Sequence, residues 1–166
     1  MQFSTVLSTD KYRVSDPQKL ESLIPYILKY TALASTSDAD WSTLGVIFTD
    51  DEEITQINED FLKHEGPTDV ISFDYIDEFD DAEYTEADPF VVGELYISLD
   101  TAWRQAQEFE QTFDEEAVLY IVHGVLHLTG YDDHCAEDIA DMRAAEKAVM
   151  NGLKKSFSNF KIFEKV

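Results

Sequence analysis

Hydrophobic and polar positions follow two periods along this chain, and each period predicts a different kind of element. Short apolar or alternating runs bounded by turn residues predict strands over residues 3–8, 43–50, 68–75 and 91–98. Apolar residues that recur every three or four positions predict helices over residues 18–33, 50–62, 100–112, 114–128 and 136–155. Strands interleaved with helices, followed by a helical C-terminal half, predict a single α/β or α+β domain.

The first predicted helix has a clear start and one conflicting residue. Asp16 followed by Pro17 is typical of an N-cap and a first helical position. The apolar residues of one face are Leu20, Leu23, Ile24, Ile27 and Leu28. Pro25 interrupts this pattern, so we expect a kink or an early end of the helix there.

Capping and turn residues mark where elements begin and end in the middle of the chain. Thr49 or Asp50 is expected to cap the helix over 50–62, and Gly66-Pro67 is expected to break the chain before the next strand. Residues 77–88 carry seven acids and no base, which favours an exposed loop.

The segment AVLYIVHGVLHL, residues 117–128, is apolar nearly all round. Such a helix is buried at the centre of a domain instead of lying on its surface. Gly130 is expected to end it. The last helix is amphipathic, and its apolar side holds Ile139, Met142, Ala145, Val149 and Met150.

Composition narrows the class of protein. With 166 residues and 44% hydrophobic residues, the chain can bury one sizeable core. It has no apolar run long enough for a membrane span, and its N-terminus lacks the pattern of a signal peptide. A single cysteine, Cys135, excludes an intrachain disulfide and fits a reducing cytoplasm. We therefore expect a cytoplasmic protein.

The net charge of −23 disfavours long-range attraction to nucleic acid, and its simplest interpretation is solubility. The charge is uneven, because the C-terminal end carries four lysines against Glu164 alone. We separate a domain over 1–155 from a basic tail over 156–166. This tail either contacts phosphates or is a frayed end.

Three of the four histidines lie in HGVLHLTGYDDH, residues 123–134. On a helix, His123 and His127 differ by about 40° in direction and about 6 Å along the axis, so both imidazoles point the same way. This spacing is typical of a zinc site, and the turn at Gly130 can bring back a third ligand. Three protein ligands leave a position open for water, as in catalytic zinc sites. The alternative is a pair of core histidines bonded to backbone carbonyls.

The zinc peptidase motif, His-Glu-x-x-His, places a general base next to the first histidine. That position is Gly124 here. The sequence therefore argues against a peptidase.

The histidine motif, together with PTDVISF at 67–73 and GELYIS at 93–98, resembles the YbeY family from about Leu44 to Met150. The resemblance implies an α/β domain with a mixed four-stranded sheet, a buried central metal-bearing helix and flanking helices. It also implies one Zn²⁺ per chain and a single-strand-specific endoribonuclease. Members of the family act in ribosomal RNA maturation, at the 3′ end of the small-subunit RNA, and in ribosome quality control.

By this resemblance, His123 and His127 match the first two zinc ligands of the family. The third ligand follows the second by six residues in the family, which is Asp133 here, and His134 is one residue beyond. Met142 and the acids before it keep the family's register without a gap, which favours Asp133. Oxygen and nitrogen both suit zinc, so both residues remain candidates.

The chain also departs from the family ahead of PTDVISF. The family usually has an arginine five residues before the proline of PTDVISF, where it is thought to meet RNA, and Leu62 stands there instead. Lys63 or His64 is a candidate to contact phosphate in its place. Glu94 is a candidate to orient a metal ligand by a hydrogen bond.

The resemblance thus implies a zinc-dependent endoribonuclease whose partners are single-stranded ribosomal RNA and the small ribosomal subunit with its proteins. One alternative is a ribosome assembly factor that holds a structural metal and cuts nothing. Another is a metallohydrolase that acts on something other than nucleic acid.

Overall fold

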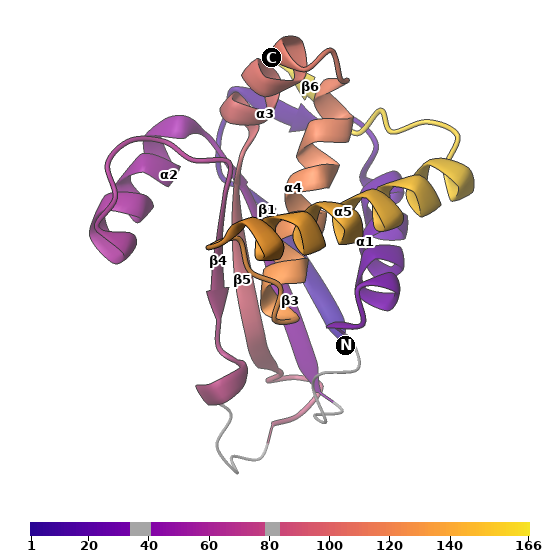
Figure 1. Ribbon diagram of the computed structural model, residues 1–166. Coiled ribbons are helices and arrows are strands. Elements are labelled where there is room, and N and C mark those ends of the chain that lie inside the picture. The colour runs from indigo at the N-terminus through magenta and orange to yellow at the C-terminus, as the bar shows by residue number, and fades with distance from the viewer. Residues whose placement is uncertain (34–40, 79–83) are drawn as a thin grey trace.

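The computed structural model describes residues 1–33, 41–78 and 84–166. Its centre is a four-stranded sheet in the order β1-β3-β5-β4 (Figure 1). The strands are β1 (Gln2–Leu7), β3 (Ser42–Thr49), β5 (Phe90–Ser98) and β4 (Val70–Asp74). The pairs β1–β3 and β3–β5 are parallel and β4 is antiparallel to β5, which confirms the predicted mixed sheet.

Helices follow the strands much as the apolar periods predicted. They are α1 (Pro17–Tyr30), α2 (Asp51–Ile57), α3 (Leu99–Glu108), α4 (Phe113–Leu128) and α5 (Ala136–Ser156). The wider turns of a π-helix over Asn58–Leu62 extend α2, and a single 3₁₀ turn covers Ile76–Glu78. Asp50, one of the two predicted caps, accepts a hydrogen bond from the Glu53 amide at the start of α2.

The helix α1 does not end at Pro25. Asp16 caps it by accepting a hydrogen bond from the Lys19 amide, and the helix continues through the proline to Tyr30. Proline removes one backbone donor from the helix. Ile24 and Ile27, on either side of it, are fully buried. Burial of this apolar face outweighs the lost hydrogen bond, so the expected early end is wrong.

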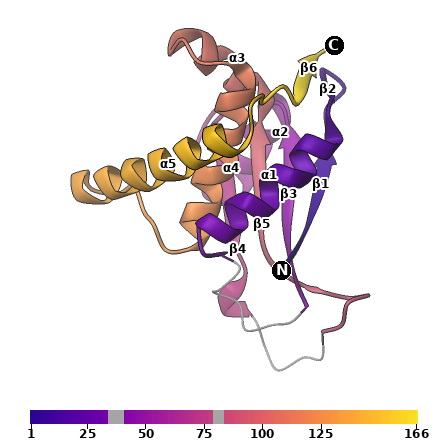
Figure 2. The ribbon, with the colours of Figure 1, turned by 90° about the vertical axis from the view of Figure 1, so that its right-hand side faces the viewer.

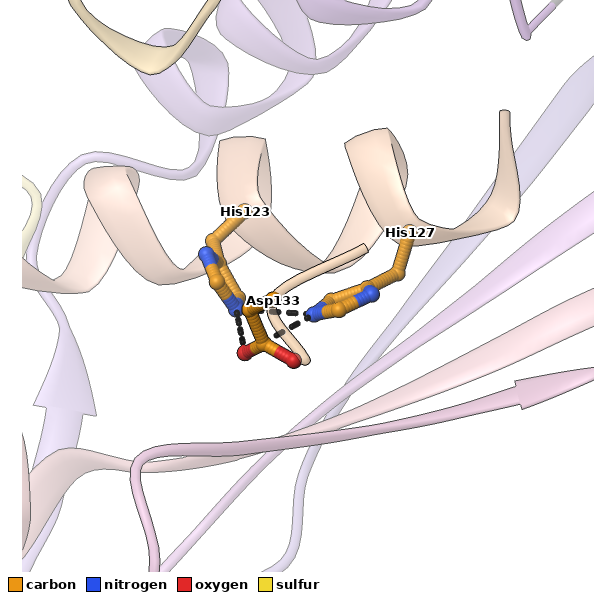
Figure 3. A group of neighbouring side chains, drawn as sticks. All are labelled: His123, His127 and Asp133. Carbon is orange, nitrogen blue, oxygen red and sulfur yellow. Dashed lines mark hydrogen bonds and ion pairs between the residues drawn. The ribbon is translucent and has the colours of Figure 1, made fainter. Parts of the chain in front are cut away.

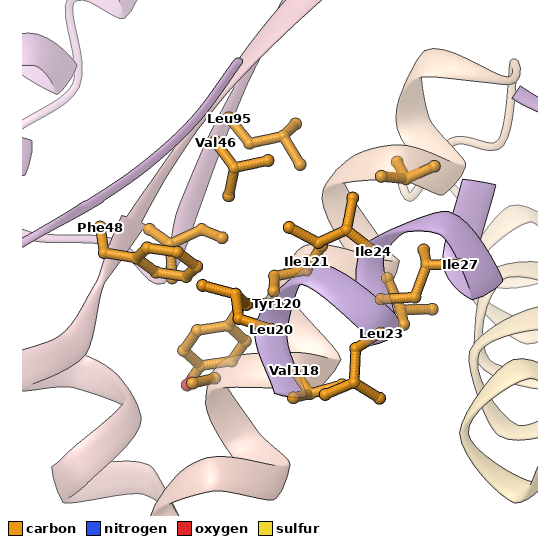
Figure 4. Close-up of a cluster of buried hydrophobic side chains, with 14 of the residues drawn as sticks. Leu20, Leu23, Ile24, Ile27, Val46, Phe48, Leu95, Val118, Tyr120 and Ile121 are labelled. Carbon is orange, nitrogen blue, oxygen red and sulfur yellow. The ribbon is translucent and has the colours of Figure 1, made fainter. Parts of the chain in front are cut away.

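The hydrophobic core lies between the sheet and the helices α1 and α4 (Figure 4). Ile24 from α1, Val46 from β3 and Leu95 from β5 are all fully buried there. Val118 and Ile121 bring α4 into the same cluster. The nearly continuous apolar surface of α4 is explained by its contacts with β4, β5, α3 and α5. The expectation of a buried central helix is confirmed.

Gly124 lets α4 lie unusually close to the sheet. A Cβ atom at this position would come within 2.9 Å of a Leu95 methyl carbon and 3.2 Å of the Ser72 hydroxyl. The Ser72 hydroxyl also donates a hydrogen bond to the Gly124 carbonyl at 3.3 Å. The glutamate of a zinc peptidase motif therefore has no space at residue 124.

Replacing Gly124 with valine is expected to destabilise the fold. The added carbons overlap the fully buried Leu95, and such overpacking costs about 1–3 kcal/mol. The matched variant is Ala144→Val on the exposed side of α5, where only helix propensity changes, by up to about 0.7 kcal/mol. The free energy of unfolding, measured in denaturant, should fall clearly further for Gly124→Val. Equal losses would contradict the close packing of α4.

The end of the chain packs against the domain. β6 (Phe163–Lys165) pairs with β2 (Tyr12–Val14) in a second, antiparallel sheet. Ile162 and Phe163 are buried, and both their amides donate hydrogen bonds to the Asp114 carboxylate at 2.8 Å. The interpretation of residues 156–166 as a frayed end therefore does not describe residues 162–165.

The acidic run over 77–88 is only partly described. Residues 79–83 lie outside the described residues, and residues 77–78 and 85–88 are exposed, as expected. In the part of the chain that the structure describes, no helix is both long and apolar enough to cross a membrane.

Candidate metal centre

The two histidines of α4 point into the same space, on the side of the helix from which Asp133 approaches (Figure 3). His123 and His127 are one turn apart, and their Nε2 atoms are separated by 3.0 Å. Their side chains are 15% and 25% exposed, so the pair is shielded yet open to solvent on one side.

The outward Nδ1 atom of each ring has a protein partner. His123 Nδ1 lies 2.6 Å from a carboxylate oxygen of Glu146, and His127 Nδ1 lies 3.1 Å from the Tyr131 carbonyl oxygen. Both partners are acceptors, which assigns the ring proton to Nδ1 in each neutral histidine. Two Nε2 lone pairs then face each other at 3.0 Å without a donor between them. This arrangement favours a cation between the rings.

Glu146 is a buried carboxylate, only 4% exposed, that accepts hydrogen bonds from two side chains. It accepts from His123 and from the Arg143 guanidinium, whose Nη1 lies 2.9 Å from Glu146 Oε2. Burial by itself raises the pKa of Glu146, but the hydrogen bonds from His123 and Arg143 outweigh it and lower that pKa below its usual value. Glu146 is therefore ionised at neutral pH and orients the His123 ring.

Asp133 reaches the histidines from the loop after α4. Gly130, with a φ of 102°, allows the chain to reverse there, and the Tyr131 amide donates to the Leu126 carbonyl. As a result, Asp133 Oδ2 lies 3.9 Å from His123 Nε2 and 3.6 Å from His127 Nε2.

These three atoms fit a metal ion of zinc size. The triangle with sides of 3.0, 3.6 and 3.9 Å has a circumscribed radius of about 2.1 Å, which matches the length of Zn–N and Zn–O bonds. Two imidazoles and one carboxylate also form a donor set that zinc accepts in catalytic sites. The residues present therefore fit the metal that the sequence predicts.

His134, the other candidate for the third ligand, does not belong to the group formed by His123, His127 and Asp133. Its side chain is 82% exposed, and its Nε2 lies 3.2 Å from Asp132 Oδ1. Asp132, Asp133 and His134 also bring ligand atoms within 4.8 Å of one another, so the loop offers a second, more exposed group. Asp133 belongs to both groups.

The remaining predicted residues are not brought to the histidines. Lys63 donates to the Asp60 carbonyl, and with His64 it lines a shallow hollow after the π-helix. Glu94 accepts a hydrogen bond from the Tyr96 hydroxyl at 3.1 Å. Because side chains alternate along a strand and Leu95 faces α4, Glu94 points to the opposite side of the sheet. The carboxylate that orients a histidine is Glu146, which the sequence analysis missed.

A signal for Glu146 is present in the sequence. It lies four residues after Met142 and three before Val149, so an acid interrupts the apolar face of the last helix. A buried acid needs a partner, and a histidine is one of the few available. The pattern does not say which residue that partner is, because α4 and α5 meet only in the folded domain.

Comparisons with known proteins identify a family. The family model described as Endoribonuclease YbeY matches residues 6–154. A protein of Rhodopirellula baltica named Endoribonuclease YbeY is 42% identical over 132 residues, covering 77% of this chain and 63% of that longer protein. One of the same name from Enterococcus faecalis is 33% identical over 165 residues, covering 93% of this chain and 100% of the relative.

A solved structure has the same fold. The solution structure of TM1509 from Thermotoga maritima aligns with a TM-score of 0.56 at 22% sequence identity, over 93% of each chain. The family model spans β3, β4 and β5 of the sheet, α4 with its histidines, and most of α5 with Glu146. On this match and on the identities of its relatives, the chain belongs to the YbeY family of endoribonucleases.

Proposed function

We propose that this protein cleaves single-stranded RNA at a zinc ion held by His123, His127 and Asp133. As a member of the YbeY family, the chain is a hydrolase that acts on RNA and takes part in ribosomal RNA processing. The finer proposal is that it matures the 3′ end of the small-subunit RNA in the cytoplasm, in contact with the small ribosomal subunit, and contributes to ribosome quality control.

The observation that carries the proposal is the pair of Nε2 lone pairs facing one carboxylate oxygen. A bound zinc ion supplies an acidified water and polarises a phosphoryl oxygen. The protein's own groups keep the site ready for this chemistry. Glu146 and the Tyr131 carbonyl hold the protons on Nδ1, so both Nε2 atoms stay available as ligands.

Metal removal tests the proposal directly. Protein purified without a histidine tag is expected to carry about one metal ion per chain and to cut a single-stranded oligoribonucleotide more readily than its duplex. Chelation should abolish cleavage, and added Zn²⁺ should restore it. The assay requires a stated salt concentration, because the affinity of so acidic a chain for RNA is expected to depend on ionic strength.

The two alternatives predict different results from the same preparation. A metal-containing protein that leaves RNA intact but binds small ribosomal subunits would support an assembly factor with a structural metal. A metal-containing protein that neither cuts nor binds RNA would favour another substrate. Either result would contradict the proposal.

A further inference from the structure

A cavity of 820 Å³ lies along α4, and its lining extends to Leu119 and Tyr120. The helices α3 and α5 extend to the same side of the domain, with α4 between them at their base (Figure 2). Leu119 and Tyr120 line the cavity from α4, Arg104 from α3 and Arg143 from α5, and Asp69 lines it ahead of β4. The lining thus holds Arg104, Arg143 and Lys154 together with the acids Asp69, Glu115 and Glu116. Lys154 pairs with Glu115, so the arginines are the cations to compare as anion-binding groups.

The cavity adjoins the metal centre. Leu119 is one helical turn before His123, so the two side chains are neighbours on the same face of α4. Arg143 lines the cavity and also bonds to Glu146, which bonds to His123. Two hydrogen bonds and one imidazole ring therefore separate the Arg143 guanidinium from the Nε2 atom that faces the metal position.

Arg143 has donors to spare for a ligand. Its side chain is 66% exposed, and only Nη1 bonds to Glu146. Its Nη2 and Nε atoms have no hydrogen-bond partner within the described residues. Arg104 is more fully engaged, since it pairs with Asp51 and donates to the Thr101 hydroxyl. Arg143 is thus the better placed of the two to bind an anion.

An RNA strand bound at the metal carries further negative phosphates on either side of the cleaved one. Arginine suits such a phosphate, because its guanidinium group can donate two parallel hydrogen bonds to it. Leu62 occupies the position where the family resemblance implies an arginine, and Lys63 and His64 lie apart from the histidines. We propose that Arg143, held by Glu146, contacts the phosphate next to the one being cleaved, and that the cavity takes the adjoining nucleotide. This inference rests on the proposed function and names a phosphate contact for it.

The variant Arg143→Gln tests this contact. It should raise the KM for single-stranded RNA about tenfold, as expected for one lost charge-assisted hydrogen bond. In chelator, where no cleavage occurs, the affinity for a labelled oligoribonucleotide should become less salt-dependent. The slope of log affinity against log salt should fall in magnitude by about 0.7, the value for one phosphate contact on a single strand. The affinity for Zn²⁺ should stay within about twofold, because Glu146 still bonds to His123.

Lys147→Gln is the matched control. It removes the same unit of charge from an exposed position on the same helix, and Lys147 does not line the cavity. Its KM and salt slope should stay near those of the unaltered protein. Equal effects of the two variants would overturn the inference, and so would a loss of Zn²⁺ affinity in Arg143→Gln with an unchanged salt slope. An unaltered protein that cuts no RNA would instead count against the proposed function.

Discussion

Replacing His127 with alanine is expected to remove metal binding and RNA cleavage together while leaving the domain folded. His127 supplies one of three ligand atoms, and loss of a direct ligand should weaken metal affinity at least as much as loss of a hydrogen-bond partner of a ligand, about 10–100-fold. Its side chain is 25% exposed and lies outside the hydrophobic core, so the free energy of unfolding should change little. Elemental analysis, cleavage of single-stranded RNA and denaturant unfolding measure the three quantities.

His64→Ala provides the matched comparison for metal content. It also removes an imidazole, but from an exposed loop that does not belong to the ligand group. Its metal content should equal that of the unaltered protein. Its cleavage rate tests the prediction from the sequence that His64 contacts a phosphate of the RNA. A His127→Ala protein that keeps its metal, or that keeps cleaving RNA without it, would refute the metal centre.

Asp133→Ala is expected to lower metal affinity by at least about 10–100-fold, whereas His134→Ala should have little effect. Asp133 Oδ2 lies within 4 Å of both histidine Nε2 atoms, whereas the His134 side chain is 82% exposed and pairs with Asp132. Competition with a chromophoric chelator gives the dissociation constants of Zn²⁺ for both variants. Because the two residues are adjacent in one loop, each variant serves as the control of the other.

Other outcomes of the two alanine variants would contradict Asp133 as the third ligand. A large loss in His134→Ala and a small one in Asp133→Ala would show that the loop rearranges when the metal binds and brings His134 to the site. Small and equal effects would mean that His123 and His127 are the only protein ligands. Oxygen and nitrogen are both acceptable zinc ligands, so the two dissociation constants distinguish the alternatives.

Much of the fold could be predicted because its signals are local. The helix starts at Asp16 and Asp50 depend on a cap and the next few residues, and α4 is recognisable from its nearly continuous apolar surface. The β2–β6 pair was missed because each strand has three residues, and the partners stand at opposite ends of the chain. Such pairing depends on the packing of Phe163 and the bonds to Asp114, which no short window contains.

The sequence by itself determined that His123 and His127 lie on the same side of a helix, because a spacing of four residues places both rings there whatever surrounds them. It also determined that residue 124 carries no acid. Only the tertiary structure showed which other residues lie near these two histidines. Glu146 and Arg143 reach His123 because α5 packs across α4, and Asp133 reaches it because the loop reverses at Gly130. Contacts between separate elements depend on how apolar faces pack, and that information is spread over the whole chain.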